Sequence, residues 1–291
     1  MLRTVRERLR EKLGRALQEY VVAELREQAE ANRAAVQAAA DGLRVELDRV
    51  ARELREEQVA AADRLDASMR AWERRQRRDL LTANDAHAVD ASARFVHAEM
   101  VQATPYFAKD DTLAAALKAA PASGLHLEFG VASGGTLRQI AEAAPPGTVF
   151  GFDSFEGLPE HWRAGFDAGA FAMDAPPEVP GAELVIGWFD QTLPGFLAEH
   201  PEPVAFLHLD ADLYSSTVTV LEALEGRLRV GTVLLFDEYF NFPGWEQHEH
   251  RAWTEFVSRT GVEFEYLGFT ADDEQMSLRI TGVPGRAAAA G

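Results

Sequence analysis

Two clusters of acidic residues each follow a short apolar run, and they are the side chains best placed to do chemistry. The run 204–209 ends in Asp210-Ala211-Asp212, and the run 233–236 ends in Asp237-Glu238. Such runs predict buried parallel strands, and open α/β sheets bind ligands beyond the carboxyl ends of their strands. Clustered carboxylates repel one another unless a cation or a proton neutralises them, and oxygen ligands suit Mg²⁺. The pattern predicts a cation site; the alternative is that these acids cap the following helices, Asp212 in particular.

The composition excludes several classes of function. Of the net charge of −18, residues 1–80 carry +2 and residues 81–291 carry −20. An acidic body argues against nucleic acid or an anionic membrane as the main partner. The absence of cysteine excludes disulfides and thiolate chemistry. With no apolar run near the ~20 residues that span a bilayer and no signal peptide, we expect a cytoplasmic protein without a transmembrane segment.

The first 81 residues predict helix. They contain no proline and only two glycines, Gly14 and Gly42, and good helix formers dominate them. Apolar residues recur at threes and fours, and the step from Leu54 to Leu65 is an eleven-residue spacing. Because a one-sided apolar stripe needs a partner helix, we expect a coiled-coil-like region that makes the protein a homo-oligomer. One helix of roughly 120 Å or two helices broken near Gly42 would both fit.

A different use of this helical region stays open. It could lie on another partner or on a membrane surface, which the basic run 74–78 would suit. After it, residues 82–124 predict a helical extension packed on a catalytic domain that reaches residue 284. We expect its aromatic residues Phe95, Tyr106 and Phe107 in the core. The alanine-rich tail 285–291 predicts disorder.

From residue 125 onward, strand and helix patterns alternate. The predicted strands are 125–130, 148–153, 184–186, 204–210, 232–237, 263–269 and 276–281, and the predicted helices are 134–144, 193–199, 216–228 and 247–260. Alternation predicts a mostly parallel sheet covered on both faces, and two final strands without a helix between them predict an antiparallel pair. Seven strands with a terminal hairpin are typical of the Rossmann-like class I methyltransferase sheet. Periodicity alone does not separate it from a dinucleotide-binding fold.

The ends of the first two predicted strands carry further ligand signals. The first ends in Glu128-Phe129-Gly130, with Gly134-Gly135 opening the next helix, so the backbone can approach a ligand there. The G-x-G-x-x-G spacing of a dinucleotide site is absent. A glutamate two residues before the first glycine suits a cationic ligand such as S-adenosylmethionine. Asp153, at the end of the second strand, could accept both ribose hydroxyls or could cap the following turn.

Three long motifs, in order, resemble the macrocin O-methyltransferase family. They are Gly151-Phe152-Asp153-Ser154-Phe155-Glu156-Gly157-Leu158-Pro159, Gly187-Trp188-Phe189-Asp190-Gln191-Thr192-Leu193-Pro194 and Leu209-Asp210-Ala211-Asp212-Leu213-Tyr214-Ser215-Ser216-Thr217. The resemblance covers roughly residues 124–281 and leaves the N-terminal helical region uncovered. It implies an S-adenosylmethionine-dependent O-methyltransferase, assisted by Mg²⁺, that methylates a hydroxyl of a sugar, glycan or glycosylated natural product.

The resemblance also implies site residues. The methionine end of the cofactor would meet Glu128, Gly130, Gly134 and Thr136, the ribose would meet Asp153, and the adenine would meet Ser154 and Trp188. Mg²⁺ would bind Asp210, Asp237 and Glu238; the family commonly has Asp-Asp where this chain has Asp237-Glu238, which shifts one ligand.

The residues leave the identity of the general base open. Asp210 and His208, which share strand parity, and His248 after the acceptor loop are the candidates. Asp212 would orient the acceptor or cap a helix. Two alternative functions also remain: a metal-independent methyltransferase acting on nitrogen or a carboxylate, and a coiled-coil scaffold with an inactive methyltransferase domain.

Overall fold

The structure is a computed structural model that describes residues 2–284, with the backbone alone for residues 2–5 and 7. The chain divides into two compact units, Met1–Arg78 and Asp79–Gly291. The tail 285–291, for which disorder is predicted, lies outside the described residues. No helix in the described range is long and apolar enough to cross a membrane.

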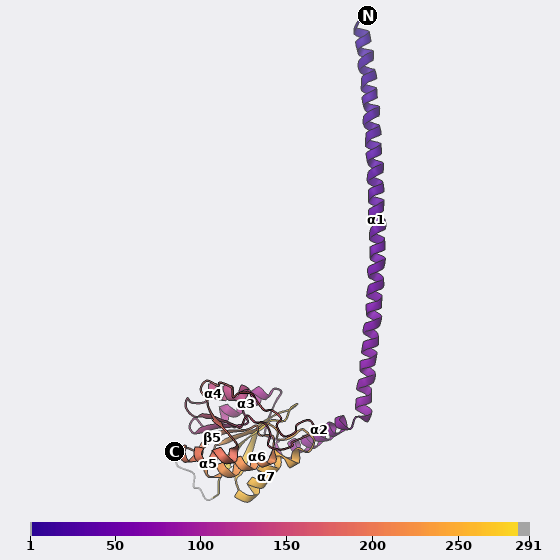
Figure 1. Cartoon of the computed structure of the whole chain (residues 1–291). Coiled ribbons are helices and arrows are strands. Elements are labelled where there is room, and N and C mark those ends of the chain that lie inside the picture. Colours follow the sequence, from indigo (N-terminus) through magenta and orange to yellow (C-terminus); the bar gives the residue numbers. More distant parts are fainter. Residues whose placement is uncertain (1, 285–291) are drawn as a thin grey trace. The chain divides into compact units, whose positions relative to one another are not determined.

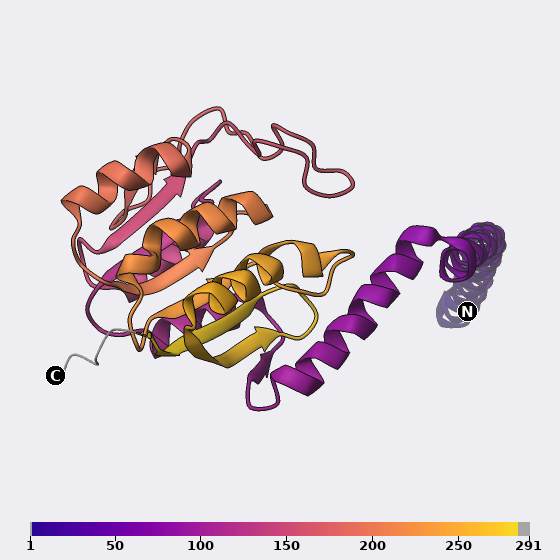
Figure 2. The same cartoon turned by 90° about the horizontal axis from the view of Figure 1, so that it is seen from below.

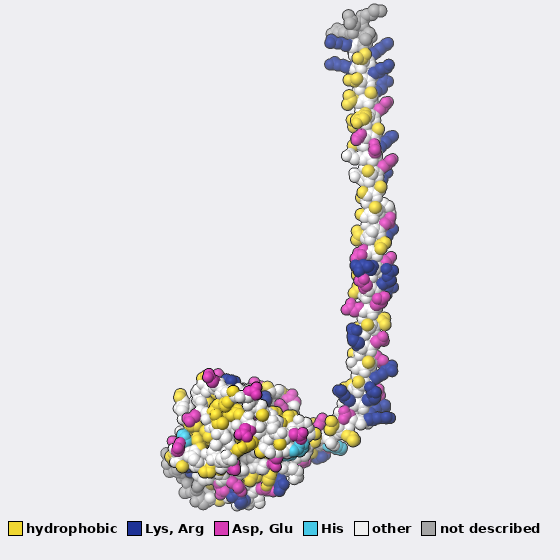
Figure 3. All heavy atoms as spheres, in the orientation of Figure 1, with side chains coloured by type: hydrophobic (Ala, Val, Ile, Leu, Met, Phe, Trp, Pro, Cys, Tyr) yellow, Lys and Arg dark blue, Asp and Glu magenta, His cyan; other side chains and the backbone are white. Residues whose placement is uncertain are grey.

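The first unit is a single helix, α1 (Leu2–Arg78), without a break at Gly42 (Figure 1). At 1.5 Å per residue it is roughly 115 Å long. Ion pairs three or four residues apart, such as that between Arg49 and Glu53, lie along its polar surface. Large apolar side chains also lie exposed along it, including Leu43, Leu54 and Leu65 at 63%, 54% and 63% exposure (Figure 3). The helix therefore carries apolar surface that its own unit leaves uncovered.

The second unit is built on an eight-stranded sheet in the order β1-β7-β8-β6-β5-β2-β3-β4. Its strands are β1 (Thr104–Tyr106), β2 (Leu125–Phe129), β3 (Val149–Asp153), β4 (Glu183–Ile186), β5 (Val204–Leu209), β6 (Val233–Phe236), β7 (Glu263–Thr270) and β8 (Met276–Gly282). All neighbours pair in parallel except that β8 is antiparallel to β6 and β7. This confirms the Rossmann-like methyltransferase sheet with its antiparallel last pair.

Helices cover both faces of the sheet (Figures 1 and 2). On one face, α5 (Phe189–Glu199), α6 (Tyr214–Leu224) and α7 (Glu249–Thr260) bury residues such as Phe196, Leu221 and Trp253. On the other face, α3 (Lys109–Ala119) and α4 (Gly135–Ala143) bury Leu113 and Leu137. The central strands β2 and β5 are buried along their whole length because both faces are covered. This explains the apolar run of β5, which only His208 interrupts, whereas β2 also buries the polar residues His126 and Glu128.

The segment before the predicted sheet differs from the expectation of helices alone. It contains α2 (Leu80–Glu99) and α3, but also the three-residue edge strand β1, which pairs with β7. Phe95 packs against the core as expected. The core prediction for Phe107 is wrong, since this side chain is 76% exposed just after the short edge strand.

Candidate active site

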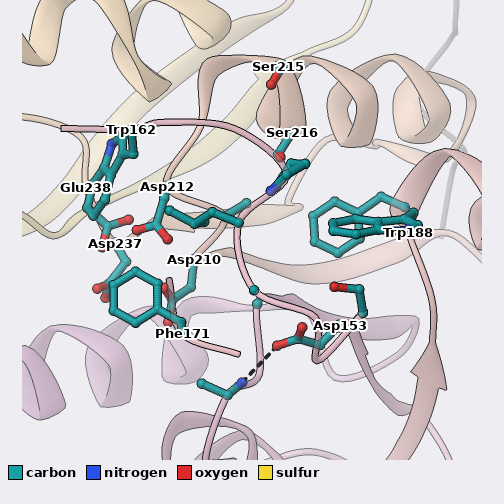
Figure 4. Close-up of a pocket in the computed structure, with 18 of the residues that line it drawn as sticks. Asp153, Trp162, Phe171, Trp188, Asp210, Asp212, Ser215, Ser216, Asp237 and Glu238 are labelled. Atoms are coloured by element: carbon teal, nitrogen blue, oxygen red, sulfur yellow. Dashed lines mark hydrogen bonds between the residues drawn. The ribbon is translucent and has the colours of Figure 1, made fainter. Parts of the chain in front are cut away.

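A cavity of about 680 Å³ opens at the carboxyl ends of the central strands. Gly130, Asp153, Asp210 and Asp237, which follow or end β2, β3, β5 and β6, all line it. In Figure 4 the acids Asp210, Asp212, Asp237 and Glu238 gather at one end, and Asp153 and Trp188 lie at the other. The parallel sheet thus brings the two predicted parts of the site, the cofactor side chains and the acids, to one cavity.

The turn after β2 is held by Asp153. Its Oδ2 accepts hydrogen bonds from the backbone N–H groups of Val131 and Ala132, both at 2.9 Å, and its Oδ1 accepts one from Phe155 at 2.8 Å. Ala132 and Phe155 adopt positive φ angles of 44° and 57°, a strained conformation for residues with a side chain. Asp153 therefore shapes the loop around the cavity as well as lining it.

The other predicted cofactor residues divide into two groups. Ser154 and Trp188 line the cavity with Gly130. Gly134, at φ 75°, is the buried N-cap of α4, and Thr136 is half-buried in the first turn of that helix; neither is part of the cavity wall described above. Their contacts with a cofactor stay predictions.

Glu128 and His208 form a buried pair, since β2 and β5 place them opposite each other. His208 Nδ1 lies 2.9 Å from Glu128 Oε1, and both side chains are fully buried. The Nε2 atom lies 3.8 Å from Asp237 Oδ1, beyond hydrogen-bonding distance, and has no other partner. Complete burial leaves His208 no direct contact with an acceptor, which is the physical reason against a catalytic base there. A cofactor contact of Glu128 stays a prediction, although its carboxylate is engaged with His208.

The acids at the cavity have strongly perturbed pKa values. Burial, and then the charge of Asp237, raise the pKa of Asp210 and of Glu238 well above their usual values. Burial raises the pKa of Asp212 to about 7 against the opposing effect of Arg163. Burial alone would raise the pKa of Asp237, but His208 holds it below its usual value. Conversely, burial would lower the pKa of His208, but Asp237 and Glu128 raise it well above normal. The raised pKa values mean that several acids at this end of the cavity resist ionisation where no cation compensates their charge.

A second buried acid supports the acidic pair after β6. Glu249, fully buried at the start of α7, accepts a hydrogen bond from the backbone N–H of Glu238 at 3.1 Å. Burial raises the pKa of Glu249 well above its usual value. Glu238 Oε2 and Glu249 Oε1 are buried without a hydrogen-bond partner. Unpaired carboxylate oxygens among other acids fit a cation.

Cation-sized groupings of ligand atoms occur twice here among the residues that the structure describes. One joins His208, Asp210 and Asp237, and the other joins Asp210, Asp212 and Glu238, with all ligand atoms in each group within 4.8 Å of one another. The donor set therefore fits a divalent cation, with Asp210 common to both groups.

The loop between β3 and β4 supplies cavity-lining residues that sequence reasoning missed. Arg163 makes two 3.0 Å hydrogen bonds to Glu274 and stacks 3.9 Å from the ring of Trp162. Trp162, Phe166 and Phe171 join Arg163 on the cavity wall. The recurrence of aromatic residues along this loop is the sequence signal that could have indicated a cavity wall. Lys109, at the start of α3, also lines the cavity and was not predicted.

The predicted base His248 lies at the N-cap of α7. Its ring packs 5.5 Å from that of Phe242, its Nδ1 is buried without a partner, and burial lowers its pKa. It is not part of the cavity wall described above. A catalytic role for His248 stays a prediction without a geometric contact to the acids.

Comparison with known proteins defines the class. Residues 127–239 match a protein-family model described as a methyltransferase domain. Fold and match together identify this part of the chain as a class I, S-adenosylmethionine-dependent methyltransferase domain. The predicted resemblance is thus confirmed at the level of the methyltransferase domain.

Several solved structures are similar to the chain. The calicheamicin methyltransferase CalS11 has 27% identity and a TM-score of 0.46, covering 58% of this chain and 76% of its own. The O-methyltransferase NovP has 24% identity and a TM-score of 0.46, covering 59% and 79%. The O-methyltransferase TomG from Streptomyces achromogenes has 16% identity and a TM-score of 0.39, covering 68% and 90%. No curated protein sequence matches the chain.

Proposed function

We propose that the protein is an O-methyltransferase that methylates a hydroxyl of a sugar, glycan or glycosylated natural product with the help of a divalent cation. One observation carries the proposal: a single cavity is lined by the Gly130 turn and Asp153 at one end and by Asp210, Asp212 and Asp237 at the other. S-adenosylmethionine supplies the methyl group when bound. In this proposal, the acids at the other end orient the acceptor oxygen and accept its proton.

Asp212 is the best-placed general base in this proposal. It lines the cavity, is 8% exposed, and adopts a φ of 60°, which is unusual for a residue with a side chain. Its pKa of about 7 matches the requirement that a base be ionised at neutral pH and yet bind a proton well. This assignment replaces Asp210 and His208 as the residue that accepts the acceptor's proton.

A cation fits the remaining acids. Asp210, Asp237 and Glu238 would hold it, and the unpaired Glu238 Oε2 is an available ligand atom. A bound divalent cation would lower the pKa of an acceptor hydroxyl and help to fix its position. Glu249 holds the backbone of Glu238, and therefore positions one ligand.

The loop residues support a sugar-like acceptor. Trp162, Phe166 and Phe171 offer apolar ring surfaces at the cavity, and Arg163 and Ser215 add polar groups to the same lining. Flat apolar surfaces with a few polar groups suit the faces and hydroxyls of a sugar ring.

The test is transfer of a labelled methyl group from S-adenosylmethionine to a panel of sugars and glycosides, with amines and carboxylic acids in parallel. We expect labelled methyl ethers in the presence of Mg²⁺ or Mn²⁺, and loss of turnover in Asp237→Ala with cofactor binding retained. Label on amines or carboxylates alone, or full turnover in Asp237→Ala, would contradict the proposal.

We further propose that α1 makes the protein a cytoplasmic homo-oligomer. The support is its exposed apolar side chains, among them Leu54, Leu65 and Trp72, at 54%, 63% and 65% exposure. A polar helix of this length gains stability from a partner that covers such a stripe. Sedimentation equilibrium should give a multiple of 32.0 kDa for the full chain and a smaller mass for Leu54→Lys/Leu65→Lys. A monomeric wild-type chain would contradict this.

A further inference from the structure

We infer that His208 is a nitrogen ligand of the cation, and that the site therefore selects a transition metal such as Mn²⁺ or Fe²⁺ over Mg²⁺. The inference rests on the proposed function, because it refines the cation that the acids would hold. It assigns to the buried histidine a role that the all-carboxylate site, Asp210, Asp237 and Glu238, does not contain.

The orientation of the His208 ring determines which of its nitrogens could bind a cation. Nδ1 lies 2.9 Å from Glu128 Oε1, so this nitrogen is the one that donates its hydrogen to the carboxylate. Histidines that bind metals commonly donate their other ring N–H to a carboxylate or carbonyl, which fixes the tautomer and raises the basicity of the ligating nitrogen. Glu128 therefore leaves Nε2 as the nitrogen with a lone pair to give.

The surroundings of Nε2 place it close enough to two carboxylates to share a cation with them. This atom is fully buried and has no hydrogen-bond partner. It faces Asp237 Oδ1 at 3.8 Å, and with Asp210 it forms a group whose ligand atoms lie within 4.8 Å of one another. Two ligands of a metal at about 2.1 Å each lie at most about 4.2 Å apart, so the 3.8 Å separation admits a shared ion.

The types of ligand determine which cation the site prefers. Mg²⁺ prefers an oxygen-only shell, whereas one imidazole with two carboxylates suits Mn²⁺, Fe²⁺ and other first-row ions. Glu238 lies in the second group of ligand atoms, with Asp210 and Asp212, and not in the group that contains His208. The nitrogen ligand thus pairs with Asp210 and Asp237.

The experiment is electron spin-echo envelope modulation of Mn²⁺ bound to the full chain. We expect ¹⁴N modulation that changes to the ¹⁵N pattern when the protein is made with ¹⁵N-labelled histidine. His208→Gln should abolish the modulation and weaken Mn²⁺ binding by at least about tenfold, with a smaller effect on Mg²⁺. The matched control is His126→Gln, a buried histidine of the adjacent strand β2 that lies beside Thr148 and should leave both readings unchanged.

The labelling arm needs no variant, so the inference can fail even if His208→Gln does not fold. Mn²⁺ bound without nitrogen modulation, or no Mn²⁺ bound at all, would overturn it. Calorimetric binding of S-adenosylhomocysteine in the same preparation, with EDTA present, separates this failure from failure of the proposed function: cofactor bound without a nitrogen ligand refutes the His208 assignment alone.

Discussion

A Cβ atom on Gly130 would lie 1.7 Å from the backbone oxygen of Asp210. The turn after β2 and the acid after β5 therefore touch through their backbones, and Gly130 also has a φ of 94° that a side chain disfavours. This contact fixes the end of the cavity at Gly130, where we propose that the cofactor binds, against the end that holds the acids. The two ends of the cavity are thus built as one unit.

Gly130→Ala should disrupt that contact. Because the clash is with backbone, which cannot move aside cheaply, we expect a loss of at least about 3 kcal/mol in the free energy of unfolding and loss of cofactor binding. Gly147→Ala is the control: it has a similar φ of 77° but nothing within 4 Å of the added Cβ. Denaturant unfolding measures both, and equal losses would show that the φ angle alone matters.

Asp212→Asn tests the general base. Removal of a positioned base should lower kcat by about 10²–10⁴-fold while leaving cofactor binding intact. Since the base acts as a carboxylate, kcat/KM of the wild type should rise with pH as Asp212 loses its proton and then level off. The pKa of Asp212 is about 7 without a metal, and a bound cation would move the rise to lower pH. Asp174→Asn, which removes the same charge from an exposed loop position, should leave the profile unchanged. A wild-type profile that falls through this range would assign the base elsewhere.

Stability without metal should fall as pH rises. The folded-state pKa values of Glu238 and Glu249 are raised, so above pH ~4.5 the unfolded chain releases protons that the folded chain retains. His208, also with a raised pKa, stabilises the fold fully below its unfolded pKa of ~6.5 and loses that contribution as pH rises further.

The buried glutamates and His208 both make the folded chain less stable as the pH rises. In EDTA we expect Tm to drop by several degrees between pH 6 and pH 8.5, and Mn²⁺ to restore most of it by neutralising the acids. Glu249→Gln should flatten the dependence. Calorimetric scans in EDTA that show a constant or rising Tm would refute this electrostatic account.

Arg163→Ala should weaken acceptor binding. The guanidinium joins the loop between β3 and β4 to Glu274 and stacks on Trp162. Its loss would therefore leave this part of the cavity wall without the contacts that hold it in place. We expect the acceptor KM to rise by about tenfold with little change in cofactor affinity, and Arg163→Lys to rescue poorly because lysine lacks the planar fork. Arg251→Ala removes a comparable stacked ion pair, on Tyr214 and Glu255, outside the cavity. Equal effects of the two changes would count against a special role for Arg163.

Strands β5 and β6 were predictable because burial on both faces favours nearly continuous apolar runs. The runs ending at Leu209 and Phe236 therefore locate Asp210 and Asp237 at strand ends from the amino-acid pattern alone. Edge strand β1 was not predicted, since three residues carry no periodicity and their pairing depends on the distant strand β7.

The partner of Glu128 could not be predicted either. Its neighbour His208 is 80 positions away, and only the register between β2 and β5 sets them opposite each other. Sequence reasoning assigned Glu128 to the cofactor because it precedes a glycine turn. The structure places its carboxylate on His208, where strand alternation directs it.

The most direct test of the central claim is calorimetric titration of the full chain with S-adenosylmethionine and with S-adenosylhomocysteine, each with Mg²⁺ or Mn²⁺ and with EDTA. We expect both to bind at one site per chain with micromolar affinity in every condition, and Asp153→Ala to weaken both because the loop around the cavity loses its anchor. Absence of binding in all conditions by a folded chain would contradict the account.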